Sequence, residues 1–172
     1  MELTTRFATS DDKVTIDNML TKLETEIFAE RGGPLFLKDL HIKIDKTLSS
    51  CVSEFSNTVP TAFPSPLTVI LGCVDTTCVG TVILEVDNKI QTENISIHPI
   101  ANILLLYVDA SSRELLVGEK LLNEAKRIAK EMLHCKYITG KTLPGDRTSK
   151  SLYENTGFKA QVITMGCSLE NS

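Results

Sequence analysis

The stretch from Ile103 to Leu133 constrains the fold more than any other part of the chain. It opens with an unbroken apolar run from Ile103 to Val108, and a short run of this kind before turn residues is typical of a strand buried on both faces. From about Leu116 the apolar residues recur at helical spacing, with charged residues on the opposite face. The pattern therefore predicts a strand, a tight turn and a long helix in direct succession.

A turn of this kind has chemical consequences, because the first backbone N–H groups of the helix have no partners within it. They lie at the positive end of the helix dipole and favour an anion. Gly118, in the first turn, would let a ligand approach the backbone, and Arg113 would add a positive charge. These residues suggest a phosphate or pyrophosphate site, with ordinary α/β architecture as the alternative.

The rest of the chain predicts further elements in a simple order. Strands are predicted at 3–8, 67–74, 78–86, 137–141 and 158–169, and helices from a cap at 9–12 to about 29, at 35–55 and at 147–155. Residues 87–99 are ambiguous, with Ile95 and Ile97 as one start for the next strand. The order β, α, α, β, β, β, α, β, α, β predicts an α+β protein with a mixed sheet. No stretch resembles a linker, so we expect a single domain over residues 1–172.

Composition excludes several classes of function. The chain has 172 residues and a net charge of −4, which gives no sign of a nucleic-acid surface. No apolar run approaches the roughly 20 residues that span a bilayer, and the first residues lack a signal-peptide pattern. The cysteine count of five is odd and contains no Cys-x-x-Cys, which predicts reduced residues in a cytoplasmic protein. No cluster has metal-ligand spacing.

Residues 108–122 resemble the acyl-CoA-binding segment of the GNAT superfamily of N-acetyltransferases. The pattern of that family is an apolar strand ending in Val, then Arg/Gln-x-x-Gly-x-Gly/Ala, then a helix with a Leu pair. Arg113 and Gly118 match its first and last positions, and Leu116 stands where the middle glycine is usual. The substitution keeps the backbone N–H groups but adds a side chain beside the expected pyrophosphate.

A second segment, residues 146–158, resembles the other signature of the same family, Asn-x-x-Ala-x-x-Leu-Tyr-Glu-x-x-Gly-Phe. The matching residues are Leu152, Tyr153, Glu154, Gly157 and Phe158. Asp146 takes the Asn position and Ser149 the Ala position. Two motifs in the right order are more specific than either alone, and the predicted element order agrees with the family across nearly the whole chain.

The resemblance implies a GNAT-like fold, a central mixed sheet flanked by helices, with acetyl-CoA as co-substrate. The residues that it implies for the acyl-CoA site are Leu106, Tyr107, Val108, Arg113, Glu114, Leu115, Leu116, Val117, Gly118, Glu119, Asp146, Lys150 and Tyr153. The backbone of 106–108 would pair with the pantetheine amides, as a strand edge does. Lys150 and Arg147 would contact phosphates or remain on a solvated helix face, and Asp146 is expected first as a helix cap.

The same resemblance assigns Tyr153 as the general acid or thiolate stabiliser, since a phenol can protonate the departing sulfur. The alternative is a tyrosine packed on the core. The sequence does not identify the general base that would take the proton from the amine. Glu85 is the first candidate because it ends a predicted strand, and His98 and Glu93 are the others. Each is also compatible with a surface position.

Together these observations predict an N-acetyltransferase that moves an acetyl group from acetyl-CoA to a primary amine by direct attack in a ternary complex. The acceptor would be a small molecule or a peptide, with a wall near 31–39, and neither nucleic acid nor membrane is expected. The alternative is a weak or inactive acyl-CoA-binding module of the same fold that regulates a partner. The oligomeric state stays open, a homodimer included.

Overall fold

The computed structural model describes residues 2–30, 32–33, 36–38, 67–87 and 99–161. Among them, the strands are β1 (Leu3–Phe7), β2 (Leu67–Val74), β3 (Thr77–Asp87), β4 (Ile100–Val108) and β5 (Tyr137–Gly140). The α-helices are α1 (Lys13–Phe28), α3 (Val117–Glu131) and α4 (Arg147–Asn155), and the 3-10 helices are η1 (Ser10–Asp12) and η2 (Ala110–Leu115). None of these helices is long and apolar enough to cross a membrane.

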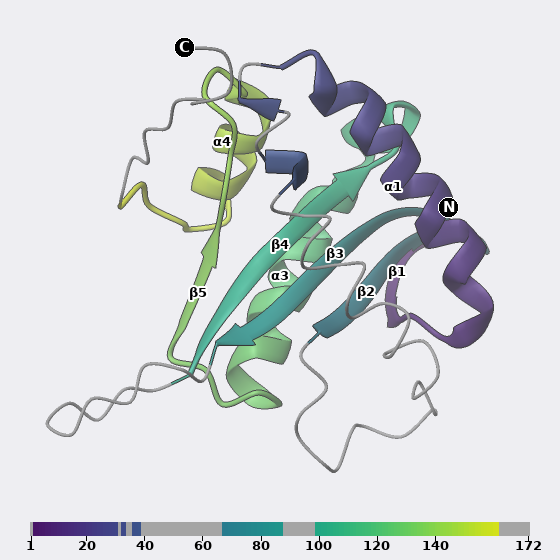
Figure 1. Cartoon of the computed structure of the whole chain (residues 1–172). Coiled ribbons are helices and arrows are strands. Elements are labelled where there is room, and N and C mark those ends of the chain that lie inside the picture. Colours follow the sequence, from purple (N-terminus) through teal and green to yellow (C-terminus); the bar gives the residue numbers. More distant parts are fainter. Residues whose placement is uncertain (1, 31, 34–35, 39–66, 88–98, 162–172) are drawn as a thin grey trace, which may run out of the picture.

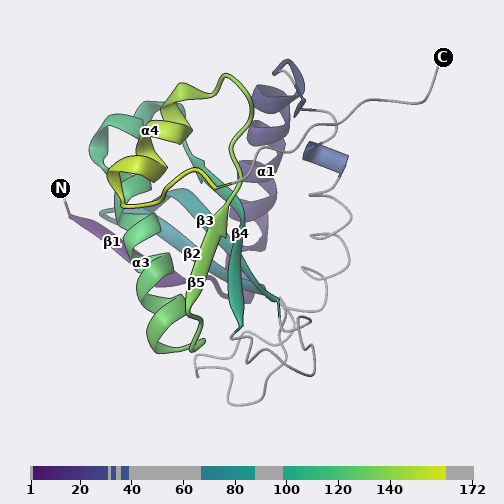
Figure 2. The same cartoon turned by 90° about the vertical axis from the view of Figure 1, so that its left-hand side faces the viewer.

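The described strands form one mixed sheet in the order β1-β2-β3-β4-β5. The pairs from β1 to β4 are antiparallel, and β4 pairs with β5 in parallel. Two views at right angles show α1 on one face of the sheet and α3 with α4 on the other (Figures 1 and 2). This arrangement confirms the predicted fold class, a mixed sheet flanked by helices.

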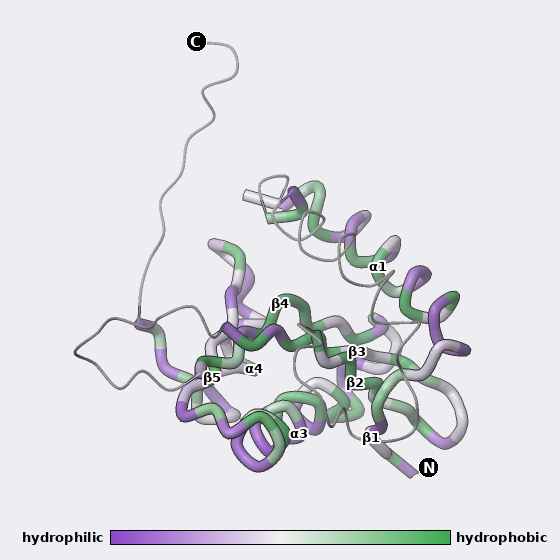
Figure 3. Tube along the Cα trace, turned by 60° about the horizontal axis from the view of Figure 1, so that its bottom comes forward, coloured by the Kyte–Doolittle hydropathy of each residue, from purple (hydrophilic) through white to green (hydrophobic). Residues whose placement is uncertain are grey.

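The central strand β4 is buried on both faces, as its unbroken apolar run predicts. Leu105 and Tyr107 belong to a core cluster with residues of α1, whereas Ile103 and Val108 belong to a cluster with residues of α3. Figure 3 shows β2 and β4 coloured as hydrophobic between the two helices. β4 therefore contributes side chains to both cores, as β2 and β3 also do.

In the second half of β4 there is a β-bulge, and its pairing with β5 has already ended. Ile83 of β3 lies opposite Leu105, whereas the next residue, Leu84, lies opposite Ile103, so Leu104 is the extra residue. Consequently Leu104 and Leu105 both contact the α1-side cluster. On the other edge, β5 pairs with β4 only as far as Ile103. The last residues of β4 therefore extend beyond β5 (Figure 1).

The predicted elements agree with the structure in most of the described chain. β2 and α4 have the predicted bounds, and the predicted hairpin is confirmed with Asp75 at a positive φ of 52°. β4 begins at Ile100, earlier than its apolar run, and η2 takes the place of the expected tight turn.

Residues 158–161 form no strand. The rest of the predicted strand 158–169, most of the helix 35–55 and the possible start at 95–97 lie outside the described residues.

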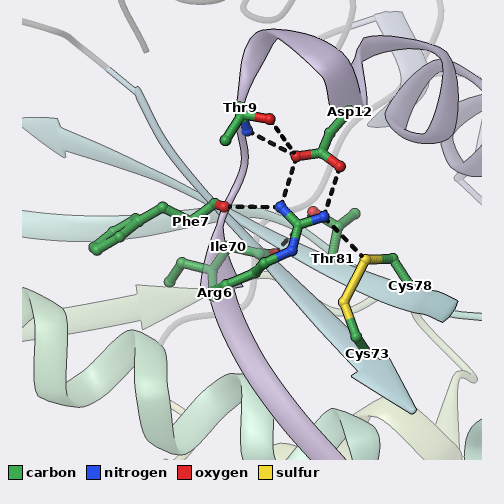
Figure 4. Close-up of polar contacts among 8 residues, drawn as sticks. All are labelled: Arg6, Phe7, Thr9, Asp12, Ile70, Cys73, Cys78 and Thr81. Atoms are coloured by element: carbon green, nitrogen blue, oxygen red, sulfur yellow. Dashed lines mark hydrogen bonds and ion pairs between the residues drawn. A yellow bond between two sulfur atoms is a disulfide. The ribbon is translucent and has the colours of Figure 1, made fainter. Parts of the chain in front are cut away.

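The cysteine prediction is wrong for one pair, because a disulfide joins Cys73 and Cys78 (Figure 4). These residues lie opposite each other across the hairpin of β2 and β3. The prediction rested on an odd count and on the absence of Cys-x-x-Cys, and neither reveals a pair that a hairpin brings together. Cys135 is a buried free thiol, and Cys51 and Cys167 lie outside the described residues.

An ion pair fixes the start of α1. Arg6 donates from both terminal nitrogens to the carboxylate of Asp12, each at 2.7 Å, and the backbone N–H of Thr9 donates to the same carboxylate at 2.8 Å (Figure 4). The hydrogen bond from Arg6 is the main reason why the pKa of Asp12 falls to about 2. The pair therefore ties the entry of α1 to β1.

Candidate functional site

An unpaired strand edge is the first feature of the candidate site. The N–H of Asp109 donates to the carbonyl of Val79 in β3 at 2.8 Å. Because backbone groups of alternate residues in a strand point to opposite edges, those of Leu106 and Val108 point away from β3. On that side β5 pairs with β4 only as far as Ile103, so no described strand pairs with Leu106. An extended amide ligand could add to this edge.

The start of α3 is the second feature. Its first backbone N–H with a helical acceptor is that of Lys120, which donates to Leu116 at 3.0 Å. The N–H groups of 117–119 precede that bond, and no side chain caps the helix. Uncapped donors at the positive end of a helix dipole favour an anion. Glu114 and Glu119 are exposed acids beside these donors, so their side chains would not attract a phosphate.

Leu116 adopts a backbone conformation that favours glycine. Its φ is 60°, in the left-handed region that favours glycine, and it connects η2 to α3. The residue is 65% exposed, so it does not fill the core beneath the helix. Leu115, the preceding residue, is half-buried and packs on the α3-side cluster. A residue other than glycine therefore holds a left-handed conformation here, which leaves strain at one residue.

Gly118 has a packing role that the sequence did not predict. It is buried, and a Cβ there would lie 2.8 Å from Cδ2 of Leu152 in α4. The absence of a side chain therefore lets α3 and α4 approach each other. The expectation that this glycine admits a ligand stays a prediction, whereas its contact with Leu152 means that a side chain at 118 would displace the end of that leucine.

The basic and acidic residues of the two motifs already have protein partners. Arg113 donates from Nε to the carbonyl of Val108 at 3.2 Å and pairs through Nη2 with Glu26. Lys150 lies 3.6 Å from Glu154. Asp146 accepts the N–H of Ser149 at 2.9 Å, which confirms it as the N-cap of α4. Phosphate contacts by these side chains stay predictions.

Tyr153 lies where β4 and β5 part. A Cβ on Gly140, the last residue of β5, would be 2.7 Å from the Tyr153 hydroxyl oxygen. The ring is buried and meets Phe158 edge-on at 5.0 Å between centroids. Burial, with a smaller contribution from the charge of Asp146, raises the pKa of Tyr153. The phenol is therefore protonated at neutral pH, and among the described residues its hydroxyl has no hydrogen-bond partner. It can donate to a ligand.

Glu85 lies in β3 opposite Asn102. Ile83 belongs to the α1-side cluster, and alternation along the strand puts Glu85 on the same face. Asn102 accepts a hydrogen bond from Thr139 of β5 at 2.6 Å. The sequence pattern did not single out Asn102 or its bond to Thr139, because Asn102 only interrupts an apolar stretch. The other base candidates, His98 and Glu93, lie outside the described residues, as do positions 31, 34, 35 and 39 of the expected wall.

No metal site accompanies these groups in the described part of the chain. Among those residues, no group of three or more His, Cys, Asp or Glu side chains could hold a metal ion. The arrangement instead brings three kinds of group to one end of β4: an open strand edge, uncapped helix amides and a buried phenol. Such a set can hold an extended ligand with a phosphate and can donate to one of its atoms.

Solved structures with the same fold include acetyltransferases. An acetyltransferase from Trypanosoma brucei aligns with a TM-score of 0.63 and 17% identity, over 98% of this chain and 100% of the other. An aminoglycoside N-acetyltransferase in complex with CoA aligns with a TM-score of 0.62 and 13% identity, over 96% and 99%. An aminoglycoside 6'-N-acetyltransferase from Acinetobacter haemolyticus gives 0.58 and 13%, over 97% and 99%. At these identities the likeness shows the fold alone.

The sequence itself carries the family assignment. No curated protein matches the chain by sequence. The family model described as the acetyltransferase (GNAT) family matches residues 38–158, which include both motifs and all strands from β2 to β5. This match spans well over half of the chain and agrees with the fold. The chain therefore belongs to the GNAT family of acetyltransferases.

Proposed function

We propose that this protein is an N-acetyltransferase that transfers an acetyl group from acetyl-CoA to a primary amine. The observation that carries the proposal is the meeting of the unpaired edge of β4 with the uncapped start of α3. Pantetheine amides would pair with Leu106 and Val108, and the diphosphate would accept N–H groups of 117–119. The acyl end would then reach the parting of β4 and β5, beside Tyr153.

The reaction needs one donor and one acceptor of protons. The neutral amine attacks the thioester carbonyl carbon, the carbon–sulfur bond breaks and the sulfur leaves as a thiolate. Tyr153, whose raised pKa keeps it protonated, donates to that sulfur. Glu85 is the proposed group that takes the amine proton, directly or through water. Both reactants bind before any bond changes, so the enzyme acts mainly by positioning them.

The second candidate is an acyl-CoA-binding module with weak or no activity. Leu116 favours it, because a strained and exposed side chain stands in the loop that would hold the diphosphate. A module of this kind would bind acetyl-CoA and act on a partner without turnover. The two candidates share the binding site and differ only in the chemical step.

The proposal is tested by thermal shift with acetyl-CoA, followed by thiol release with a panel of amines. The panel contains polyamines, lysine peptides and aminoglycosides, the last because two proteins of this fold act on them. Stabilisation with thiol release for at least one amine supports the enzyme. Stabilisation without release from any amine supports the module. An unchanged melting temperature at millimolar acetyl-CoA contradicts both.

A further inference from the structure

Two ion pairs connect α1 to the loop that leads into α3. Lys22 Nζ lies 2.7 Å from Asp109 Oδ1, and Glu26 pairs with Nη2 of Arg113. Lys22 and Glu26 are one helical turn apart and therefore share a face of α1. Asp109 and Arg113 have the same spacing in the loop. The four residues thus form two parallel contacts between the same two segments.

The loop side of this arrangement is anchored to the sheet. Asp109 accepts a hydrogen bond from the Tyr107 hydroxyl at 2.9 Å, and its own N–H donates to Val79. Tyr107 is 3% exposed, and burial is the main reason why its pKa is raised, with the bond to Asp109 second. Arg113 is held by its bond to the carbonyl of Val108. The side chains of Asp109 and Arg113 are therefore held by the sheet and the loop, and they in turn pair with side chains of α1.

The signs of the charges select one position of the helix. Lys22 faces an acid and Glu26 faces a base, so each pair is attractive only in this alignment. Moving α1 by one turn along its axis would bring Glu26 to Asp109, two like charges. The pairs therefore specify where α1 lies, even though exposed ion pairs contribute little stability individually.

We propose that these four residues form a charge clamp in which Lys22 and Glu26 are positioning residues for the acyl-CoA loop. In this clamp the side chain of Arg113 holds α1 and does not bind the diphosphate, which is left to the backbone N–H groups of 117–119. Anchoring Arg113 on both sides reduces the freedom of the loop just before those groups and so preorganises them. The affinity part of the proposal rests on the proposed acetyl-CoA site, whereas the clamp itself does not.

Exchanging the charges of Glu26 and Arg113 distinguishes the charge clamp from direct binding of the diphosphate by Arg113. The variants are Glu26→Arg, Arg113→Glu and the double variant that carries both. Glu30→Arg is the matched control, because Glu30 is an exposed acid near the same helix end without an ion pair among the described residues. Hydrogen exchange of the α1 amides and calorimetric titration with acetyl-CoA are measured on each full-length protein.

The clamp predicts that each single variant speeds exchange in the C-terminal half of α1 and weakens acetyl-CoA binding about threefold, the scale of one exposed ion pair. The double variant restores both quantities, and Glu30→Arg changes neither. Glu26→Gln and Arg113→Gln give the same non-additive pattern without charge reversal.

Two results overturn the proposal. A double variant with restored α1 protection and lost affinity shows that Arg113 binds the phosphate itself. Single variants with unchanged exchange show that α1 is not held by these pairs. If the wild-type protein fails to bind acetyl-CoA, the proposed function fails, and the exchange data alone then decide whether the clamp exists.

Discussion

Leu116 departs from the resembled motif and adopts a backbone conformation that favours glycine. Its φ of 60° crowds Cβ against the following carbonyl oxygen, at a cost of about 1 kcal/mol. The side chain is mostly exposed and recovers little of that cost by burial. The position therefore explains physically why a glycine suits the resembled pattern, and strain here is compatible with a functional loop.

We predict an inverted ranking of glycine and alanine at this position. Leu116→Gly should be more stable than Leu116→Ala by about 1 kcal/mol, because only glycine relieves the left-handed strain. In a helix interior the order is the reverse. Urea unfolding of both variants measures the difference. An alanine variant as stable as the glycine variant would show that Leu116 is not strained in solution.

Tyr153 is the residue on which the proposed chemical step depends. We expect Tyr153→Phe to lower turnover about 100-fold or more, the usual scale for loss of a general acid. The affinity of the variant protein for acetyl-CoA should change little, because the phenylalanine ring keeps the packing on Phe158. Steady-state kinetics and titration measure the two quantities. Full activity in the phenylalanine variant would remove Tyr153 from the mechanism.

At the scale of elements, the contact between α3 and α4 joins two parts of the candidate site. Gly118 of α3 faces Leu152, and the next residue of α4 is Tyr153, so the approach of the helices also places the phenol. A change at this contact should therefore act on stability and on the chemistry together. The element that carries the proposed anion site and the one that carries the proposed acid are packed as one unit.

We predict that Gly118→Ala destabilises the fold by no more than about 1 kcal/mol, the low end of the cost of overpacking, because the methyl of Leu152 that it meets can shift. In the double variant with Leu152→Ala, the alanine at 118 should cost much less, because the leucine methyl that it meets is gone. A double-mutant cycle in urea measures this coupling. Additive effects would mean that the close contact is absent in solution.

The start of α1 gives a pH prediction. The pKa of Asp12 is about 2 in the folded chain against an ordinary value of 3.8, so the pair with Arg6 stabilises the protein above about pH 4. That stability is lost as the pH falls towards 2, because the folded chain then binds the proton as well. Asp12→Asn should cost about 2 kcal/mol at pH 7 and little near pH 2.

Asp17→Asn is the control for this effect, since it breaks an exposed pair with Lys13 and should cost less than about 1 kcal/mol at any pH. Thermal unfolding of the three proteins between pH 2 and pH 7 measures the comparison. A deficit of Asp12→Asn that stays constant over this range would contradict the role of the ion pair.

At the scale of the whole molecule, local patterns predicted more of the fold than of the site. β2 and α4 have the predicted bounds because turn residues or a cap mark their ends. The start of β4 was missed because Asn102 breaks the apolar run, and its partner Thr139 is 37 residues away. η2 was missed because a 3-10 turn leaves no helical periodicity in the sequence.

The limits for the site have the same physical origin. The strand–turn–helix pattern predicted the helix amides, since they depend on consecutive residues, whereas the open strand edge was expected only from the family resemblance. Neither could predict the clamp, in which Lys22 and Glu26 are each 87 residues from their partners. Nor could the cysteine count reveal the hairpin disulfide. Contacts between distant segments can be identified only once the fold is known, and the ion pairs and the disulfide are contacts of this kind.

A crystal structure grown with acetyl-CoA tests the central claim most directly. The account predicts that the pantetheine amides pair with the backbone of Leu106 and Val108, and that the diphosphate accepts the N–H groups of 117–119. The thioester sulfur should lie within hydrogen-bond reach of the Tyr153 hydroxyl. A nucleotide bound elsewhere, with the edge of β4 unpaired and the start of α3 empty, would contradict it.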